Sequence, residues 1–227
     1  MSSLPNFYAF EGIDGAGKTT TIERVRRHYE SLGRRVTVVG KHEQLELLEG
    51  PANELYRTLT ENRLGGRTPR EVLEFASRRY WLLYLALWHE FVSCYVCEAS
   101  RSGAQMILAD SWIYRPIARF SYAGDEDARF IQRCFDVAAL PDRIFFLVAP
   151  VDVVYERRKA HPAKDFGVFD GLEGQSRKNY VAFQSAIQDE LRALIPKDRL
   201  VEVAADDGEA EVADAVIAVM DGSSRWR

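Results

Sequence analysis

The feature that most constrains this chain is the run GIDGAGKT at positions 12–19, which matches the pattern GxxxxGK[ST]. It follows the apolar run Phe7–Phe10 and precedes a helical pattern, which is the context of a phosphate-binding loop between a strand and a helix. The glycines allow a tight turn, so that backbone N–H groups and the positive end of the next helix dipole point at an anion. Lys18 adds a charge between the phosphates, and the Thr19 hydroxyl is a typical Mg²⁺ ligand.

This motif predicts a site for a nucleoside triphosphate. The residues expected to contact the nucleotide are Gly12, Asp14, Gly15, Ala16, Gly17, Lys18, Thr19 and Thr20.

Composition favours one α/β domain over residues 1–227. A chain of 227 residues, 47% hydrophobic and 28% charged, suffices for one well-buried core and is short for two. The net charge of −4 argues against a general nucleic-acid surface, which depends on clustered excess cations. No basic and apolar targeting segment stands at the N-terminus, and no run approaches a membrane span. A cytoplasmic protein without a nucleic-acid or membrane partner is expected.

The cysteines are Cys94, Cys97 and Cys134, an odd number without the spacing of a disulfide framework or a four-ligand zinc site. A redox pair of Cys94 and Cys97 is one interpretation. Packing of both in the core is favoured, because they lie inside a helical apolar pattern.

Apolar runs alternate with helical patterns along the chain. Five strands are expected at 7–10, 35–39, 105–110, 143–148 and 200–203. Helices are expected at 20–32, 51–63, 68–100, 113–123, 126–139, 151–160, 174–195 and 208–220. This alternation predicts a five-stranded parallel sheet with helices on both faces and ligands at the carboxyl ends of the strands. Residues 159–174, rich in Gly, Pro and charge, are expected to form a small mobile lid between two helices.

Two groups of charged residues add to the phosphate loop. Asp110 ends an apolar strand at the edge where the loop opens, so it is expected to meet Mg²⁺ directly or through water; the alternative is a helix N-cap. Arg157, Arg158 and the lysines 159 and 164 cluster at the start of the lid. Phosphoryl transfer spreads negative charge over the transferred group, so catalytic roles are expected for Arg157 and Arg158. The alternative for this cluster is a solvated helix end.

The run FEGIDGAGKTT at positions 10–20 resembles the start of thymidylate kinases, including a carboxylate at Asp14 inside the loop. The resemblance implies a P-loop kinase fold, and it implies that Asp14 contacts the sugar 3′-hydroxyl of the acceptor nucleotide. It extends to Phe75 and Arg79, which the family uses to stack on thymine and to reach a base oxygen. Positions 75 and 79 share one helix face. Core packing of Phe75 is the alternative.

Two departures concern the acceptor. Where the family carries an arginine after the strand-end aspartate, this chain has Ser111, and where the family carries an arginine after the second strand it has Lys41. A lysine is not equivalent to the bidentate guanidinium fork. Arg115, Arg119 and Lys41 are the candidate replacements for gripping an acceptor phosphate.

The resulting hypothesis is ATP- and Mg²⁺-dependent phosphoryl transfer to a nucleoside monophosphate, from dTMP to dTDP or with a related acceptor. One alternative is a kinase of a nucleoside or another small-molecule hydroxyl, which would need a carboxylate such as Glu43 as base. Another is a non-catalytic nucleotide-binding paralogue. An aromatic stripe with Tyr80, Trp81, Tyr84, Trp88, Phe91 and Tyr95 indicates a core face or subunit interface, and the resemblance implies a homodimer built on that helix.

Overall fold

The computed structural model describes residues 4–40, 54, 77–101, 105–124, 126–158, 160–206 and 208–222. Five parallel strands form one sheet in the order β2-β3-β1-β4-β5. Their bounds are β1 Leu4–Glu11, β2 Arg35–Val39, β3 Gln105–Asp110, β4 Pro141–Val148 and β5 Leu200–Ala204. The predicted five-stranded parallel sheet is therefore confirmed.

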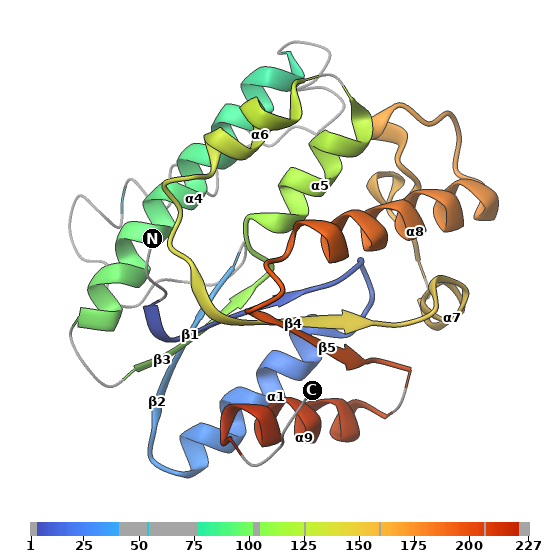
Figure 1. Cartoon of the computed structure of the whole chain (residues 1–227). Coiled ribbons are helices and arrows are strands. Elements are labelled where there is room, and N and C mark those ends of the chain that lie inside the picture. The colour runs from blue at the N-terminus through green and yellow to red at the C-terminus, as the bar shows by residue number, and fades with distance from the viewer. Residues whose placement is uncertain are drawn as a thin grey trace.

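Helices cover both faces of this sheet (Figure 1). The described helices are α1 Lys18–Ser31, α4 Arg78–Arg101, α5 Tyr114–Ala123, α6 Ala128–Cys134, α7 Val151–Arg157, α8 Arg177–Leu194 and α9 Glu209–Met220. Two short 3₁₀ turns, η2 Ala163–Phe166 and η3 Val168–Asp170, lie between α7 and α8. We keep the name lid for residues 160–174. The expected α/β architecture is confirmed.

Alternation along β1 explains why the sheet is buried on both sides. Phe7 and Ala9 pack into a core shared with α4, α5, α6 and α8, whereas Tyr8 and Phe10 pack into a second core shared with α1 and α9. Successive side chains of a strand point to opposite faces, so an unbroken apolar strand needs a helical layer on each side. All four of these side chains are almost completely buried.

The direction in which successive strands are added to the sheet reverses at β1. The chain moves from β1 to β2 and β3 on one side of β1, and then to β4 and β5 on the other. In register, Phe10 lies beside Asp110 of β3 and Glu11 beside Phe146 of β4. Ligands of such sheets bind where the strand order reverses. A ligand is therefore expected to bind at the loop that follows Glu11.

Several helices are shorter than the sequence predicts, for local reasons. The expected helix at 126–139 is only Ala128–Cys134, because the Asp127 side chain accepts the N–H groups of Arg129 and Phe130 and fixes the start. The expected helix at 151–160 ends at Arg157, and Arg158 is extended. The next helix begins at Arg177 instead of 174, with the Ser176 hydroxyl as its cap.

Residues 51–63, with the exception of Glu54, and the beginning of the predicted helix at 68–100 lie outside the described residues. Within α4, Trp88 and Tyr95 are buried, as a core face requires, and Tyr80 is half exposed. The expectation of a core position is wrong for Cys94, which is exposed on α4. Among the helices that the structure describes, none is both long and apolar enough to cross a membrane.

Candidate active site

The phosphate-binding loop joins β1 to α1, and Lys18 is the first residue of that helix. Its ammonium group donates to the carbonyls of Gly12 and Ile13, both at 3.0 Å. Burial lowers the pKa of Lys18, and the positive charge of Arg115 adds to this, while nearby carboxylates act in the opposite direction. A buried ammonium folded back on its own loop is held where it meets an entering phosphate.

Two glycines of the loop are required by close packing. A Cβ at Gly12 would lie 2.7 Å from the carbonyl oxygen of Leu147, and a Cβ at Gly15 would lie 2.6 Å from Cδ of Arg158. Both glycines also have positive φ values, 147° and 91°. The backbone of β4 and an arginine side chain therefore contact the loop so closely that only glycine fits at these two positions.

Thr19 and Asp110 form the candidate metal site. The Thr19 hydroxyl, in the first turn of α1, donates to Oδ2 of Asp110 at the end of β3, at 2.7 Å. A hydroxyl and a carboxylate are both hard oxygen ligands of the kind that Mg²⁺ prefers. The structure thus brings together the two residues that the sequence predicts as metal ligands.

Glu11 holds the turn that follows Asp110. It is fully buried. Its carboxylate accepts the backbone N–H of Trp112 at 2.8 Å and the hydroxyl of Ser111 at 3.1 Å. Burial raises the pKa of Glu11, against the opposing effect of these hydrogen bonds and of Lys18. Ser111 has a left-handed φ of 68°, a conformation uncommon for a residue other than glycine. Its side chain therefore faces Glu11 and carries no charge to a ligand.

Arg115 reaches the phosphate loop from α5. Its guanidinium donates to the Gly12 carbonyl at 2.8 Å and forms an ion pair of 2.5 Å with Asp14. Asp14 also lies 3.9 Å from the ammonium of Lys164. Burial on its own would raise the pKa of Asp14, but the charges of Arg115, Lys18 and Lys164 outweigh it and hold that pKa well below its usual range. Asp14 is therefore ionised at neutral pH.

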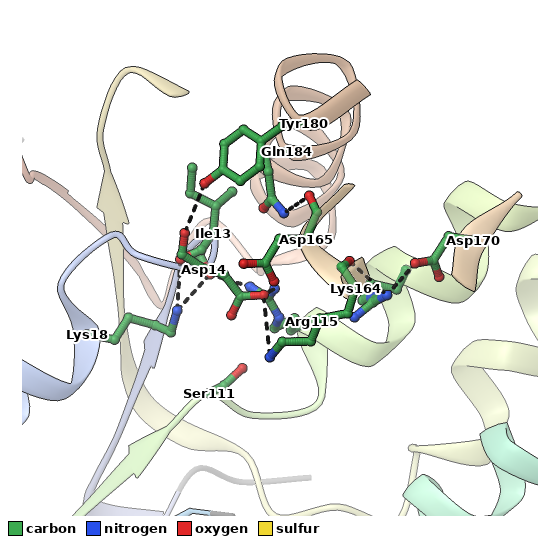
Figure 2. Close-up of polar contacts among 12 residues, drawn as sticks. Ile13, Asp14, Lys18, Ser111, Arg115, Lys164, Asp165, Asp170, Tyr180 and Gln184 are labelled. Atoms are coloured by element: carbon green, nitrogen blue, oxygen red, sulfur yellow. Dashed lines mark hydrogen bonds and ion pairs between the residues drawn. The ribbon is translucent and has the colours of Figure 1, made fainter. Parts of the chain in front are cut away.

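The lid closes over the same loop (Figure 2). Asp165 of η2 is completely buried and pairs with the guanidinium of Arg158, whose Cδ and Cγ atoms lie against Gly15. Burial, followed by the charge of Asp14, raises the pKa of Asp165 to about 6. Three cations stabilise the ionised form of Asp14, whereas two stabilise that of Asp165. As the pH falls, Asp165 is therefore the first of the two carboxyl groups to be protonated.

Other predicted residues lie further from the loop. Arg157 donates to the carbonyls of Ala205 and Asp206, both at 2.7 Å, beyond the end of β5. Arg79 forms two 2.8 Å hydrogen bonds with Glu126.

Its neighbour Arg78 contacts the lid instead, through the Phe169 carbonyl and Asp170. Lys41, Glu43 and Phe75 lie outside the described residues. Their roles, and that of Arg79, remain predictions.

Sequence reasoning missed the acidic side chains that organise the cations. Asp170, almost fully buried, holds both Arg78 and Arg119, and Asp165 holds Arg158. Nothing in a short irregular segment distinguishes a buried aspartate from a solvated one. The run Lys164-Asp165, with opposite charges next to each other in a basic segment, was the only available signal.

Comparison with known proteins assigns the chain to a family. A family model described as thymidylate kinase matches residues 10–212. The chain belongs to the thymidylate kinase family. It is thus a nucleotide kinase, a phosphotransferase, and its sheet and loop are those of the P-loop kinase fold.

Curated relatives agree over most of the chain. The thymidylate kinase of Bifidobacterium longum subsp. infantis is 28% identical over 188 residues, which cover 78% of this chain and 71% of that protein. The thymidylate kinase of Fervidobacterium nodosum is 26% identical over 159 residues, covering 67% and 71%.

Proposed function

We propose that this chain transfers the γ-phosphoryl group of ATP to a nucleoside monophosphate, with deoxythymidine monophosphate as the first acceptor to test. Family membership supports the reaction class. The observation that carries the proposal is that Lys18 and Arg115 both donate to the Gly12 carbonyl, at 3.0 and 2.8 Å. An acceptor that is already anionic needs such cations and needs no general base.

The donor phosphates would lie along the loop from Gly12 to Thr20. The backbone N–H groups of Gly15, Gly17 and Thr20 would supply donors just before and at the start of α1, where the helix dipole favours negative charge. Lys18 would exchange its two carbonyl partners for phosphate oxygens. Its burial strengthens this interaction, because little water competes with the phosphates.

Thr19 and Asp110 fit Mg²⁺, since the two oxygens are already within hydrogen-bonding distance of each other at the carboxyl end of β3. Bound Mg²⁺ would neutralise charge on the donor phosphates. The role of the protein is to keep both side chains at this position, which the Glu11 hydrogen bond to Trp112 supports by fixing the turn after Asp110.

Arg115 would grip the acceptor phosphate in place of the family arginine that Ser111 replaces. It stands on the first turn of α5 and is buried, so its guanidinium loses little freedom on binding. Asp14, ionised beside it, would accept the sugar 3′-hydroxyl, as the family resemblance implies. Lys41, Phe75 and Arg79 are proposed to contact the rest of the acceptor.

Arg158 is the better placed of the two predicted catalytic arginines. Its side chain lies on Gly15, so a short movement of its guanidinium would reach phosphates on the loop. Arg157 is engaged by two backbone carbonyls beyond β5 and would act on the donor side of the site. A cation on the transferred group stabilises the charge that develops there.

We further propose that two copies of the chain pair through α4. Tyr80, Leu83 and Leu87 lie on one side of this helix and are each about half exposed, at spacings of three and four residues. Replacing Leu83 and Leu87 by glutamate should convert a dimer to a monomer, measured by light scattering after size-exclusion chromatography. A wild-type monomer would contradict the proposal.

The decisive experiment measures ADP release with ATP, Mg²⁺ and a panel of monophosphates, nucleosides and small alcohols. We expect turnover with monophosphates, and loss of at least a thousandfold in Lys18→Ala, because Lys18 acts on the transferred charge. Turnover confined to hydroxyl acceptors would contradict a monophosphate acceptor. Nucleotide binding without turnover on any acceptor would favour a non-catalytic paralogue.

A further inference from the structure

Asp165 is a charged side chain held from several directions inside the lid. Its side chain is 0% exposed and accepts from the guanidinium of Arg158. Its own carbonyl accepts from the amide of Gln184 on α8 at 2.8 Å, and its N–H donates to the Pro162 carbonyl at 2.9 Å. Burial of an ionised carboxylate is costly unless partners compensate for it. The position of Asp165 is therefore fixed by both backbone and side-chain contacts.

The ion pair between Asp165 and Arg158 lies directly above the phosphate loop. Arg158 follows the last residue of α7, and its Cδ and Cγ atoms cover Gly15. Lys164, next to Asp165 in the chain, also approaches the loop, with its ammonium 3.9 Å from the Asp14 carboxylate. Two consecutive lid residues, one acidic and one basic, thus lie close to Asp14 of the loop (Figure 2).

Charged and titratable groups of several neighbouring elements act on Asp165. They are Asp14 of the phosphate loop, Arg158 just after α7, Lys164 of the lid and Tyr180 of α8. Lys18 and Arg115 act on Asp14, and His161 of the lid packs against Phe166, the neighbour of Asp165. Burial and Asp14 together outweigh the cations, and they bring the pKa of Asp165 to about 6. This carboxyl group is therefore close to gaining a proton near neutral pH.

Donor phosphates would raise the pKa of Asp165 in two ways. They would bring negative charge onto the loop beneath Gly15, and they would compete with Asp165 for the guanidinium of Arg158. Extra negative charge and loss of a cation both favour the protonated carboxyl. The effects therefore have the same sign.

We propose that Asp165 is a positioning residue that holds Arg158 over the phosphate loop, releases it to the donor phosphates, and takes up one proton from solvent in exchange. The inference rests on the proposed function, because it requires a nucleoside triphosphate on the loop. If Asp165 only held the lid in place, it would contribute to stability alone, and nucleotide binding would not be linked to protonation of Asp165.

The test is calorimetric titration of the protein with a non-hydrolysable ATP analogue and Mg²⁺ at pH 6.5, in two buffers of different ionisation enthalpy. The buffer dependence of the heat gives the number of protons taken up. If the carboxyl rises by one pKa unit or more from about 6, wild type should take up about half a proton more than Asp165→Asn. Protonation of the analogue is the same in both titrations and cancels.

Two further variants make the comparison specific. Arg158→Gln should also lose most of the extra uptake, because without the Arg158 cation Asp165 is already largely protonated at pH 6.5 before the analogue binds. Asp170→Asn should keep it, since Asp170 pairs with Arg78 and Arg119 in the same lid but not with Arg158. Folding of each variant is checked by circular dichroism, and Arg158→Gln serves as the comparison if Asp165→Asn is unfolded.

Equal proton uptake by wild type and the folded comparison variant would overturn the inference while leaving the proposed function intact. No binding of the analogue to wild type would overturn the donor site itself, and the inference with it. Loss of the extra uptake in Asp165→Asn and Arg158→Gln, but not in Asp170→Asn, would support it.

Discussion

The ammonium of Lys18 and the guanidinium of Arg115 donate to the same oxygen, the carbonyl of Gly12, at 3.0 and 2.8 Å. One cation comes from the helix that follows the phosphate loop, and the other comes from α5, about a hundred residues later in the chain. Their convergence is a consequence of sheet order, because β1 and β3 are neighbours and α5 follows β3. Repulsion between two buried cations is tolerated here because Asp14 lies beside Arg115.

Arg115→Ala should reduce kcat/KM for a monophosphate acceptor about ten- to a hundredfold, since a charge-assisted contact to phosphate is worth roughly 1.5 to 3 kcal/mol. Steady-state kinetics at saturating ATP measure the effect. Arg79→Ala is the matched control, because it also removes a guanidinium that is paired with a carboxylate, Glu126, but away from the loop. Its effect should be confined to the KM for the acceptor. An Arg115→Ala enzyme with unchanged kcat/KM would mean that another cation grips the acceptor.

Arg158→Gln should lower kcat more than it weakens ATP affinity, because the contact with the transferred group forms late. The reduction in kcat should be about tenfold or more. Arg157→Gln is the control at the adjacent position, where the guanidinium binds backbone carbonyls after β5. A larger loss of kcat in Arg157→Gln than in Arg158→Gln would reverse the assignment.

Gly15→Ala should destabilise the protein by roughly 1 to 3 kcal/mol more than Gly17→Ala. Both glycines have φ of 91°, so backbone strain is matched, but a Cβ at Gly17 meets no atom within 4 Å. At Gly15 it would meet Arg158 and Val154. Urea unfolding of the two variants gives the difference, and equal stabilities would show that Arg158 does not lie on the loop in solution.

Asp110→Asn should raise the Mg²⁺ concentration needed for half-maximal activity, since one negative oxygen ligand or water anchor is lost. The neutral amide can still accept the hydrogen bond from Thr19, so the fold should be little changed. A metal titration of the rate at fixed ATP makes the measurement. An unchanged titration would leave Asp110 with a purely structural role.

Sequence patterns predicted this sheet well because its signals are local. The apolar strands and the glycine motif are each recognised from a few adjacent residues. The positions of the phosphate loop and of the contact between Thr19 and Asp110 then follow from the strand order. Arg115 was one of three candidate replacements for the missing family arginine, and only the fold shows that it reaches Gly12. The choice depends on the direction of a side chain one helical turn beyond Ser111, which a sequence pattern does not fix.

The lid was the least predictable part. It was expected as an irregular basic segment, and in the structure its buried acidic residues organise the arginines around it. Whether Asp165 is solvated or buried against Arg158 depends on how η2 packs on α8, and that packing joins residues far apart in the chain. Propensity and charge patterning describe a segment alone and carry no information on such long-range burial.

The raised pKa of Asp165 gives a last prediction, on stability. With a pKa of about 6 in the folded protein and about 3.9 in the unfolded chain, the folded state binds more protons between pH 4 and 6. The unfolding free energy should therefore fall as pH rises through that window, by about 1 to 2 kcal/mol more in wild type than in Asp165→Asn. Asp14, whose pKa is lowered, contributes the opposite slope, but only below pH 4. Urea unfolding at pH 4.5, 5.5 and 6.5 compares the two proteins, and parallel curves would show that Asp165 ionises normally in the folded state.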